Sequence, residues 1–207
     1  MVKIAVLVSG GGTNLQALIN AQNEKIIESG KITLVVSNNK NAYALERAKN
    51  AKIKNVVVSK KDCISNDEFN QKLINVLKEN NIDLVVLAGF LCILSKEFIK
   101  AFENRIINVH PSLIPSFCGD GFYGLKVHEK ALEKGVKVTG ATVHFVNEIV
   151  DGGKIIMQKA VNVRKNDTPI TLQKRVMQQA EWKILPKSVE LVCASILNGE
   201  NLWIFTN

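Results

Sequence analysis

Short apolar runs alternate with amphipathic segments along the first half of the chain. Each run has the length of a strand buried on both faces, and apolar residues at helical spacing follow it. The expected strands are residues 3–8, 32–37, 55–58, 84–88 and 106–109, and the expected helices follow residue 13 and cover 42–49, 67–80 and 95–102. This alternation predicts an α/β fold, a mostly parallel twisted sheet flanked by helices in a Rossmann-like order.

The pattern changes after residue 125. A helix is expected over 126–134, followed by strands over 138–146 and 154–163 that the turn Asp151-Gly152-Gly153 joins. A short connection favours an antiparallel strand pair, so the sheet is expected to be mixed near the C-terminal part of the chain. A long helical stretch then runs to about residue 198. We expect Asp167 or Thr168 to cap it and Pro186 to kink or divide it.

Asn108 and His110 lie at the end of the fifth apolar run, where Pro111 would stop the strand. Residues two apart on a strand share a face, and the carboxyl end of a strand is where open α/β sheets bind ligands. An amide can donate to a developing oxyanion while an imidazole moves a proton, as acyl transfer requires. The alternative is that Asn108 ends the strand and His110 is a partnered, partly buried histidine.

Three consecutive glycines, Gly10 to Gly12, follow the first strand. They would leave Thr13 and Asn14 at the positive end of the next helix, which favours a phosphate group. Leu15 stands where a dinucleotide fingerprint needs its third glycine, and the second strand ends in residues 37–39 without an acidic residue. The loop therefore predicts a phosphate monoester site, and its alternative is a purely structural turn.

Composition narrows the class of partner. Lys and Arg number 27 against 19 Asp and Glu, a net charge of +8, yet no basic run exceeds two residues and aromatic residues make up 6%. Surfaces that bind nucleic acid cluster their charge, so we expect an anionic small molecule as the partner rather than a nucleic acid. The alternative is that the lysines only solvate helix faces. The longest apolar run, 84–94, is shorter than the roughly 20 residues of a membrane span.

The four cysteines are scattered, which predicts neither a metal site nor a disulfide framework. The apolar run at the start of the chain is too short for a signal peptide. These features predict a cytoplasmic protein that does not bind a membrane.

Five segments occur together in a fixed order: residues 9–14 (SGGGTN), 87–95 (LAGFLCILS), 107–115 (INVHPSLIP), 140–146 (GATVHFV) and 151–153 (DGG). By these segments the chain resembles the folate-dependent phosphoribosylglycinamide formyltransferases, the glycinamide ribonucleotide transformylase family. The resemblance covers nearly the whole chain. It implies one formyltransferase domain over residues 1–207, with a phosphate-binding half of about 1–100 and a folate and catalytic half of about 101–207.

The resemblance also implies roles for single residues. The implied catalytic residues are Asn108, His110 and Asp151. The implied substrate contacts are Gly12, Thr13 and Asn14, with Gln178 and Glu181 in a stretch whose spacing is shifted by one residue. The implied folate contacts are Asn66, Leu91, Cys92, Ile93, Leu94 and Asn108. The chain departs from the family pattern at Cys92, where many members carry arginine, near Asn66, which can be arginine, and at Lys154, which replaces a common proline.

The implied reaction moves a formyl group from 10-formyltetrahydrofolate, as co-substrate, to the primary amine of glycinamide ribonucleotide, with no metal. Asn108 can donate to the tetrahedral oxyanion, and His110 can donate there or relay protons through a water. Asp151 beside the imidazole would raise the His110 pKa, or is only a turn residue. We expect His128, on a solvated helix face, and His144, within a strand, to be structural.

Three other functions compete with this interpretation. Methionyl-tRNA formyltransferase and formyltetrahydrofolate deformylase share the catalytic half, but the chain length and a first strand at residue 3 favour neither. A non-catalytic anion-sensing module would need the glycine loop without Asn108, His110 and Asp151. The expected partners are therefore two small-molecule substrates, bound by a monomer or homodimer.

Overall fold

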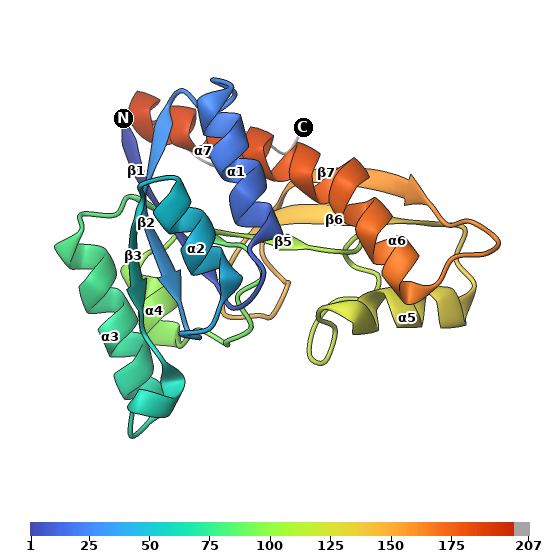
Figure 1. The fold of residues 1–207 in the computed structure, drawn as a ribbon, viewed down its shortest axis with the longest axis horizontal. Helices are drawn as coiled ribbons and strands as arrows, with labels where there is room; N and C mark the ends of the chain where they lie inside the picture. The colour runs from blue at the N-terminus through green and yellow to red at the C-terminus, as the bar shows by residue number, and fades with distance from the viewer. Residues whose placement is uncertain (201–207) are drawn as a thin grey trace.

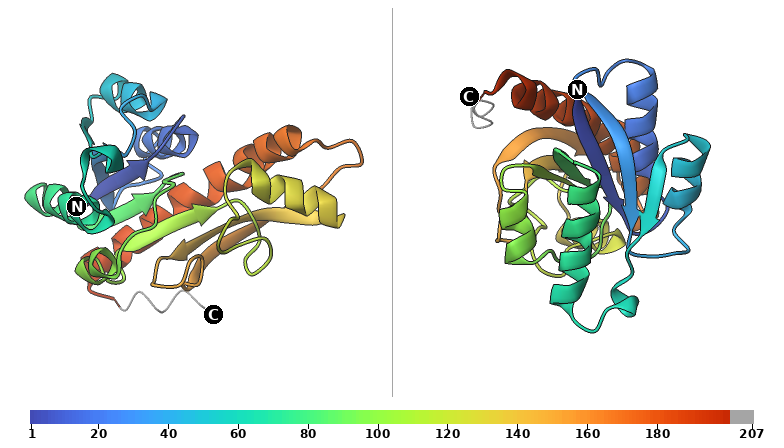
Figure 2. Two further views of the ribbon diagram at one scale, coloured as in Figure 1. Left: turned by 90° about the horizontal axis from the view of Figure 1, so that it is seen from below. Right: turned by 90° about the vertical axis from the view of Figure 1, so that its left-hand side faces the viewer.

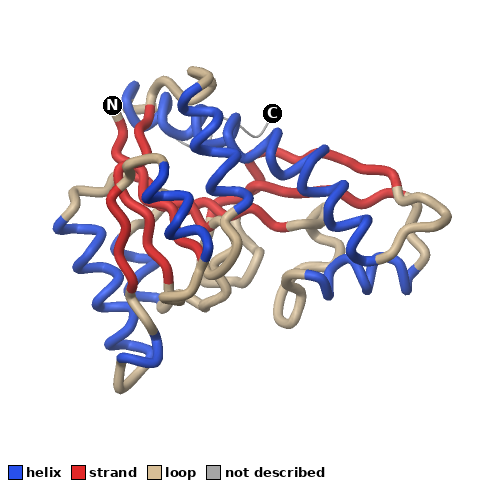
Figure 3. Tube along the Cα trace, in the orientation of Figure 1, coloured by secondary structure: helices blue, strands red, loops and turns tan. Residues whose placement is uncertain are grey.

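A computed structural model describes residues 1–200, which form a seven-stranded sheet in the order β3-β2-β1-β4-β5-β6-β7 (Figures 1 and 3). The strands are β1 (Val2–Val8), β2 (Gly30–Ser37), β3 (Lys54–Val57), β4 (Leu84–Leu87), β5 (Ile106–His110), β6 (Val138–Phe145) and β7 (Ile155–Asn162). The first five strands are parallel, as their apolar runs predict. The predicted α/β class with its mixed sheet is confirmed.

The sheet ends in two antiparallel strand pairings, whereas the sequence predicts one such pairing. β6 pairs with β7 as expected, and β6 also pairs antiparallel with β5, with Asn108 opposite His144 and His110 opposite Thr142. The link from β5 to β6 is a long loop followed by a helix, so no short turn in the sequence announces this second pairing. The register of β5 against β6 decides which side chains share the site.

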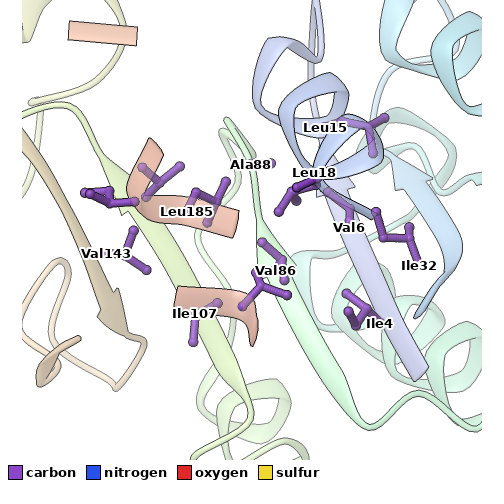
Figure 4. Packing of buried hydrophobic residues seen from close by; sticks show 14 of the residues in the cluster. Ile4, Val6, Leu15, Leu18, Ile32, Val86, Ala88, Ile107, Val143 and Leu185 are labelled. Atoms are coloured by element: carbon purple, nitrogen blue, oxygen red, sulfur yellow. The ribbon is translucent and has the colours of Figure 1, made fainter. Parts of the chain in front are cut away.

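Helices cover both faces of the sheet (Figure 2). They are α1 (Thr13–Asn23), α2 (Tyr43–Asn50), α3 (Asn66–Glu79), α4 (Lys96–Ala101), α5 (Leu125–Lys134), α6 (Pro169–Val176) and α7 (Trp182–Asn198), with short turns η1 (Lys60–Asp62) and η2 (Met177–Glu181). Ile4 and Val6 of β1 lie in the core cluster with α1 and α7, whereas Ala5 and Leu7 lie in the cluster with α3 and α4. Figure 4 shows Leu15 of α1 over the first of these faces.

The long C-terminal helical stretch is divided, but upstream of the predicted position. Thr168, rather than Asp167, caps α6 and accepts a hydrogen bond from the Thr171 N–H in a capping box. The break is η2, a π-helical turn, and α7 continues through Pro186. The widened turn lies on the N-terminal side of Pro186, where a proline ring clashes with the preceding helical turn.

The carboxyl ends of the parallel strands meet at one edge of the sheet. The glycine loop leaves β1 there, residues 88–95 leave β4, and β5 ends there with His110. The chain's strand order reverses between β1 and β4, which is the usual place for ligand binding in open α/β sheets. Within residues 1–200, no helix is both long enough and apolar enough to cross a membrane.

Candidate active site

β5 carries Asn108 and His110 to this edge on one face, as their spacing predicts. His110 is buried, and Asn108 is half-buried. The Nδ2 of Asn108 lies 3.2 Å from Nε2 of His144, its partner across the β5–β6 ladder. Asn108 therefore does not merely end the strand, because a second site residue fixes its amide.

His144 lies within β6 and has hydrogen-bond partners, as expected of a structural histidine, and one of these partners is the site residue Asn108. Its Nδ1 lies 2.8 Å from the Phe145 carbonyl oxygen, which can only accept, so we assign the proton to Nδ1. Its Nε2 lies 3.2 Å from the Asn108 Nδ2 and 3.5 Å from Oδ1 of Asp151. The signal for this role is the cross-strand register, which the sequence alone does not set.

Asp151 contacts both histidines and the loop of residues 111–124 that follows β5. Its Oδ2 lies 3.5 Å from Nδ1 of His110 and accepts a hydrogen bond of 2.9 Å from the Gly119 N–H. Asp151 sits in a turn with φ of 55°, so the turn interpretation holds as well, and the turn aims its carboxylate into the site. Burial raises the Asp151 pKa, but the contacts with His144, Gly119 and His110 outweigh burial and lower it.

Burial determines the charge of His110. Burial lowers its pKa, and the neighbouring His144 adds to this, whereas Asp151 and the Phe117 carbonyl oppose it without cancelling it. The predicted effect of Asp151 is therefore present, but the His110 pKa lies below its ordinary value. Nε2 of His110 lies 2.9 Å from the Phe117 carbonyl oxygen and carries the proton that it donates there.

His128 is fully buried, which corrects its expected place on a solvated face. Together with Val127 and Ala131 it forms the inward side of α5, which packs against α6. Both ring nitrogens lack a hydrogen-bond partner within residues 1–200. Burial, with a further contribution from the nearby His110 when that ring is protonated, lowers the His128 pKa to about 4.

The glycine loop has the form of an anion-binding helix start. Gly12 is the N-cap of α1 in the left-handed conformation, with φ of 69°, and a Cβ there would meet the Ala44 Cβ at 2.6 Å. Arg47 of α2 binds the Gly11 carbonyl oxygen through Nε at 2.8 Å. The first N–H groups of α1 have no carbonyl acceptor within the helix, so they are available for an anion.

Asn14 and Glu181, both predicted substrate contacts, are brought together from opposite ends of the chain. The Asn14 Nδ2 donates a 2.6 Å hydrogen bond to Glu181 Oε2, and both side chains are buried. Burial raises the Glu181 pKa to about 7, although the hydrogen bond from Asn14 opposes this. Gln178 is exposed, and within residues 1–200 its side chain forms no hydrogen bond or ion pair with this pair.

The predicted folate loop, residues 91–94, follows β4 at the same edge. Leu91 and Ile93 are exposed, Leu94 is buried, and Cys92 lies 2.9 Å from the Asn38 Nδ2. The Leu91 N–H donates to Ser9 Oγ at 2.8 Å, which fixes this loop beside the glycine loop. Asn66 is not brought to this group by any hydrogen bond or ion pair between described side chains, and it lies exposed at the start of α3.

Comparison with known proteins agrees with this geometry. Residues 2–189 match the family described as Formyl transferase. This chain belongs to that family. It is 41% identical over 186 residues to phosphoribosylglycinamide formyltransferase of Haemophilus influenzae, covering 90% of this chain and 84% of that protein.

The chain is also similar to part of longer proteins and to solved structures. The chain is 44% identical over 206 residues to the trifunctional purine biosynthetic protein adenosine-3 of Homo sapiens, covering 98% of this chain. It spans 20% of the length of that protein. The crystal structure of glycinamide ribonucleotide transformylase 1 from Symbiobacterium toebii superposes with a TM-score of 0.88 at 40% identity, over 94% of this chain and 89% of that one.

Proposed function

We propose that this chain transfers the formyl group of 10-formyltetrahydrofolate to the primary amine of glycinamide ribonucleotide, a step of purine biosynthesis. The observation that carries the proposal is the contact set of Asn108, His110, His144 and Asp151 at the carboxyl edge of the sheet. A formyl transferase family member needs an oxyanion donor and a proton-transfer group there, and this set supplies both.

The reaction begins when the substrate amine attacks the formyl carbon, which forms a C–N bond and a tetrahedral oxyanion. One N–H of the Asn108 amide is directed to His144, and the other is free to donate to the oxyanion. Because its pKa is lowered, His110 is neutral in the free protein and can take up the amine proton. Asp151 then stabilises the imidazolium.

Collapse of the intermediate breaks the bond between the formyl carbon and the folate nitrogen. That nitrogen gains the proton held by His110, directly or through a water, so protons balance over the reaction. The Nε2 proton of His110 is donated to the Phe117 carbonyl in the free protein. Substrate binding must therefore break this contact and move the proton to Nδ1, beside Asp151, so that Nε2 can take up the amine proton.

Two binding regions complete the proposal. The ribonucleotide phosphate binds at the start of α1, at Gly12, Thr13 and Asn14, with Glu181 behind Asn14. We assign Gln178 to the same substrate from the family resemblance alone. The folate binds along Leu91 to Leu94, where the exposed side chains of Leu91 and Ile93 suit an aromatic ring. We assign Asn66 to the folate from the family resemblance alone.

An acceptor comparison tests the proposal. Purified protein and 10-formyltetrahydrofolate are incubated with glycinamide ribonucleotide, with methionyl-tRNA, or with neither, and tetrahydrofolate release is followed. We expect release only with the ribonucleotide. Release without an acceptor would indicate a deformylase, and release with methionyl-tRNA would indicate the tRNA enzyme.

A further inference from the structure

Glu181 is a buried carboxyl group without an ion-pair partner. Its side chain is 6% exposed, and Asn14 is its hydrogen-bond partner at 2.6 Å. Within residues 1–200, no Lys, Arg or His nitrogen forms an ion pair with it. A buried carboxylate without a cation is costly, so this site favours the neutral acid.

The π-helical turn η2 places Glu181 here. The turn packs against β6, β7, α6 and α7, and its last residue reaches the start of α1. The titratable side chains on these elements are His144 on β6, Lys159 on β7, Lys174 and Arg175 on α6, and Lys183, Lys187, Glu190 and Cys193 on α7, whereas α1 has none. Arg175 is paired with Asp167 instead.

Asn14 shows which protonation state fits. It is 8% exposed, and its Oδ1 is buried without a hydrogen-bond donor within residues 1–200. A carboxylic acid can donate through its O–H and accept through its other oxygen, whereas a carboxylate can only accept. The neutral form of Glu181 can therefore accept from Asn14 and still donate into this buried polar site, which the carboxylate cannot do.

We propose that Glu181 is a positioning residue of the anion site, which orients Asn14 and takes up a proton when a phosphate dianion binds at the start of α1. This inference rests on the proposed function, which places the substrate phosphate there. A dianion next to Asn14 would be repelled by an ionised Glu181 behind it. Phosphate binding and protonation of Glu181 therefore favour each other, and each strengthens the other by the same factor.

The direction of the pH effect follows from this linkage. Glu181 has a pKa of about 7 in the free protein, so it is mostly neutral at pH 6 and mostly ionised at pH 8. Anion affinity should be full at pH 6 and fall as the pH rises. If only the neutral form binds, the loss is about tenfold between pH 6 and pH 8.

Direct titration of Glu181 by carbon NMR in the native protein tests the proposal with sulfate as the probe. Sulfate is a dianion throughout this range, so any pH dependence comes from the protein. We expect sulfate to shift the Gly11 to Thr13 amide signals and to raise the Glu181 pKa. Amide shifts with an unmoved Glu181 pKa would overturn this inference and leave the proposed function intact. No amide shift would overturn both.

Variants give a second measurement. Glu181→Gln keeps the shape of the neutral acid and cannot ionise. In this variant the fall in sulfate affinity above pH 7, and the matching rise in KM for glycinamide ribonucleotide, should both disappear. Glu190→Gln is the matched control, because Glu190 lies on α7 and binds the backbone N–H groups of Glu28 and Ser29. It should keep the native pH profile. A native profile in Glu181→Gln would contradict the proposal.

Discussion

At the scale of single residues, Asp151 is the carboxylate that contacts both histidines of the site. Its carboxylate lies 3.5 Å from a ring nitrogen of His110 and 3.5 Å from one of His144. The neutral His110 that burial favours and the imidazolium that Asp151 favours are the two states that proton transfer needs.

Asp151→Asn should lower the His110 pKa further, because an amide cannot stabilise imidazolium as a carboxylate does. Proton NMR titration of the imidazole measures this directly, and maximal turnover should fall with it. Asp120→Asn, on the exposed neighbouring loop, should leave the titration unchanged. An unmoved or raised His110 pKa in Asp151→Asn would show that Asp151 serves only the turn.

His128 should make the folded protein sensitive to acid. The unfolded chain protonates this imidazole near pH 6.5, whereas in the folded protein its pKa is about 4. The unfolded state thus binds more protons in this window, so the free energy of unfolding falls as the pH drops from 6.5 toward 4, by up to about 3 kcal/mol. In urea unfolding at pH 7.5 and pH 5, His128→Leu should lose part of this fall. If the free energy of unfolding of His128→Leu fell between pH 7.5 and pH 5 by as much as that of the native protein, His128 would not be the source of the acid sensitivity.

Much of the site could be predicted residue by residue. Asn108, His110 and Asp151 lie within motifs whose chemistry can be interpreted locally, and the structure brings them together. His144 and His128 could not be placed, because their environments depend on strand register and on which side of α5 faces the core. Neither is fixed by neighbouring residues.

At the scale of elements, the connection from β1 to α1 shows why glycine is needed at one position and not at another. Gly12 has a positive φ and no room for a Cβ beside Ala44. Gly10 has open space around its Cβ position and no positive φ.

Gly12→Ala should therefore destabilise the protein by about 1–3 kcal/mol, through strain in the left-handed conformation and the clash with Ala44. Gly10→Ala should change the free energy of unfolding by less than about 0.5 kcal/mol. Chemical denaturation of the two variants checks the difference. Equal stabilities would mean that the backbone of this loop differs from the structure.

Most elements could be predicted because strands buried on both faces leave continuous apolar runs and helices leave a periodic pattern. The π turn η2 could not, since its extra residue is visible only as a shift of one position in the spacing before Glu181. Pro186 predicts a break in the helix, and the structure places that break upstream of the proline.

At the scale of the whole molecule, the two proposed substrate sites lie at one edge of the sheet on different elements. The proposed phosphate site belongs to α1, and the proposed folate loop follows β4, with β5 ending between them and β6. Ser9 ties the two regions together through the Leu91 N–H. A change at the start of α1 should therefore affect one substrate much more than the other.

Thr13→Asp should raise the KM for glycinamide ribonucleotide at least tenfold, because a carboxylate at the start of α1 repels the phosphate. The same carboxylate favours the helix start, so stability should not fall. Thr13→Asn is the neutral control, and folate binding, measured by calorimetry, should be unchanged in both. If Thr13→Asp weakened the binding of both ligands equally, the phosphate would not bind at this position.

The most direct test of the account is the rate of formyl transfer from 10-formyltetrahydrofolate to glycinamide ribonucleotide in the native protein and in His110→Ala. The native protein should catalyse the transfer, and the variant should be slower by about 10²- to 10⁴-fold, the loss expected for a positioned proton-transfer group. Thermal unfolding should show that the variant remains folded. No transfer by the native protein, or near-native transfer by a folded His110→Ala, would contradict the account.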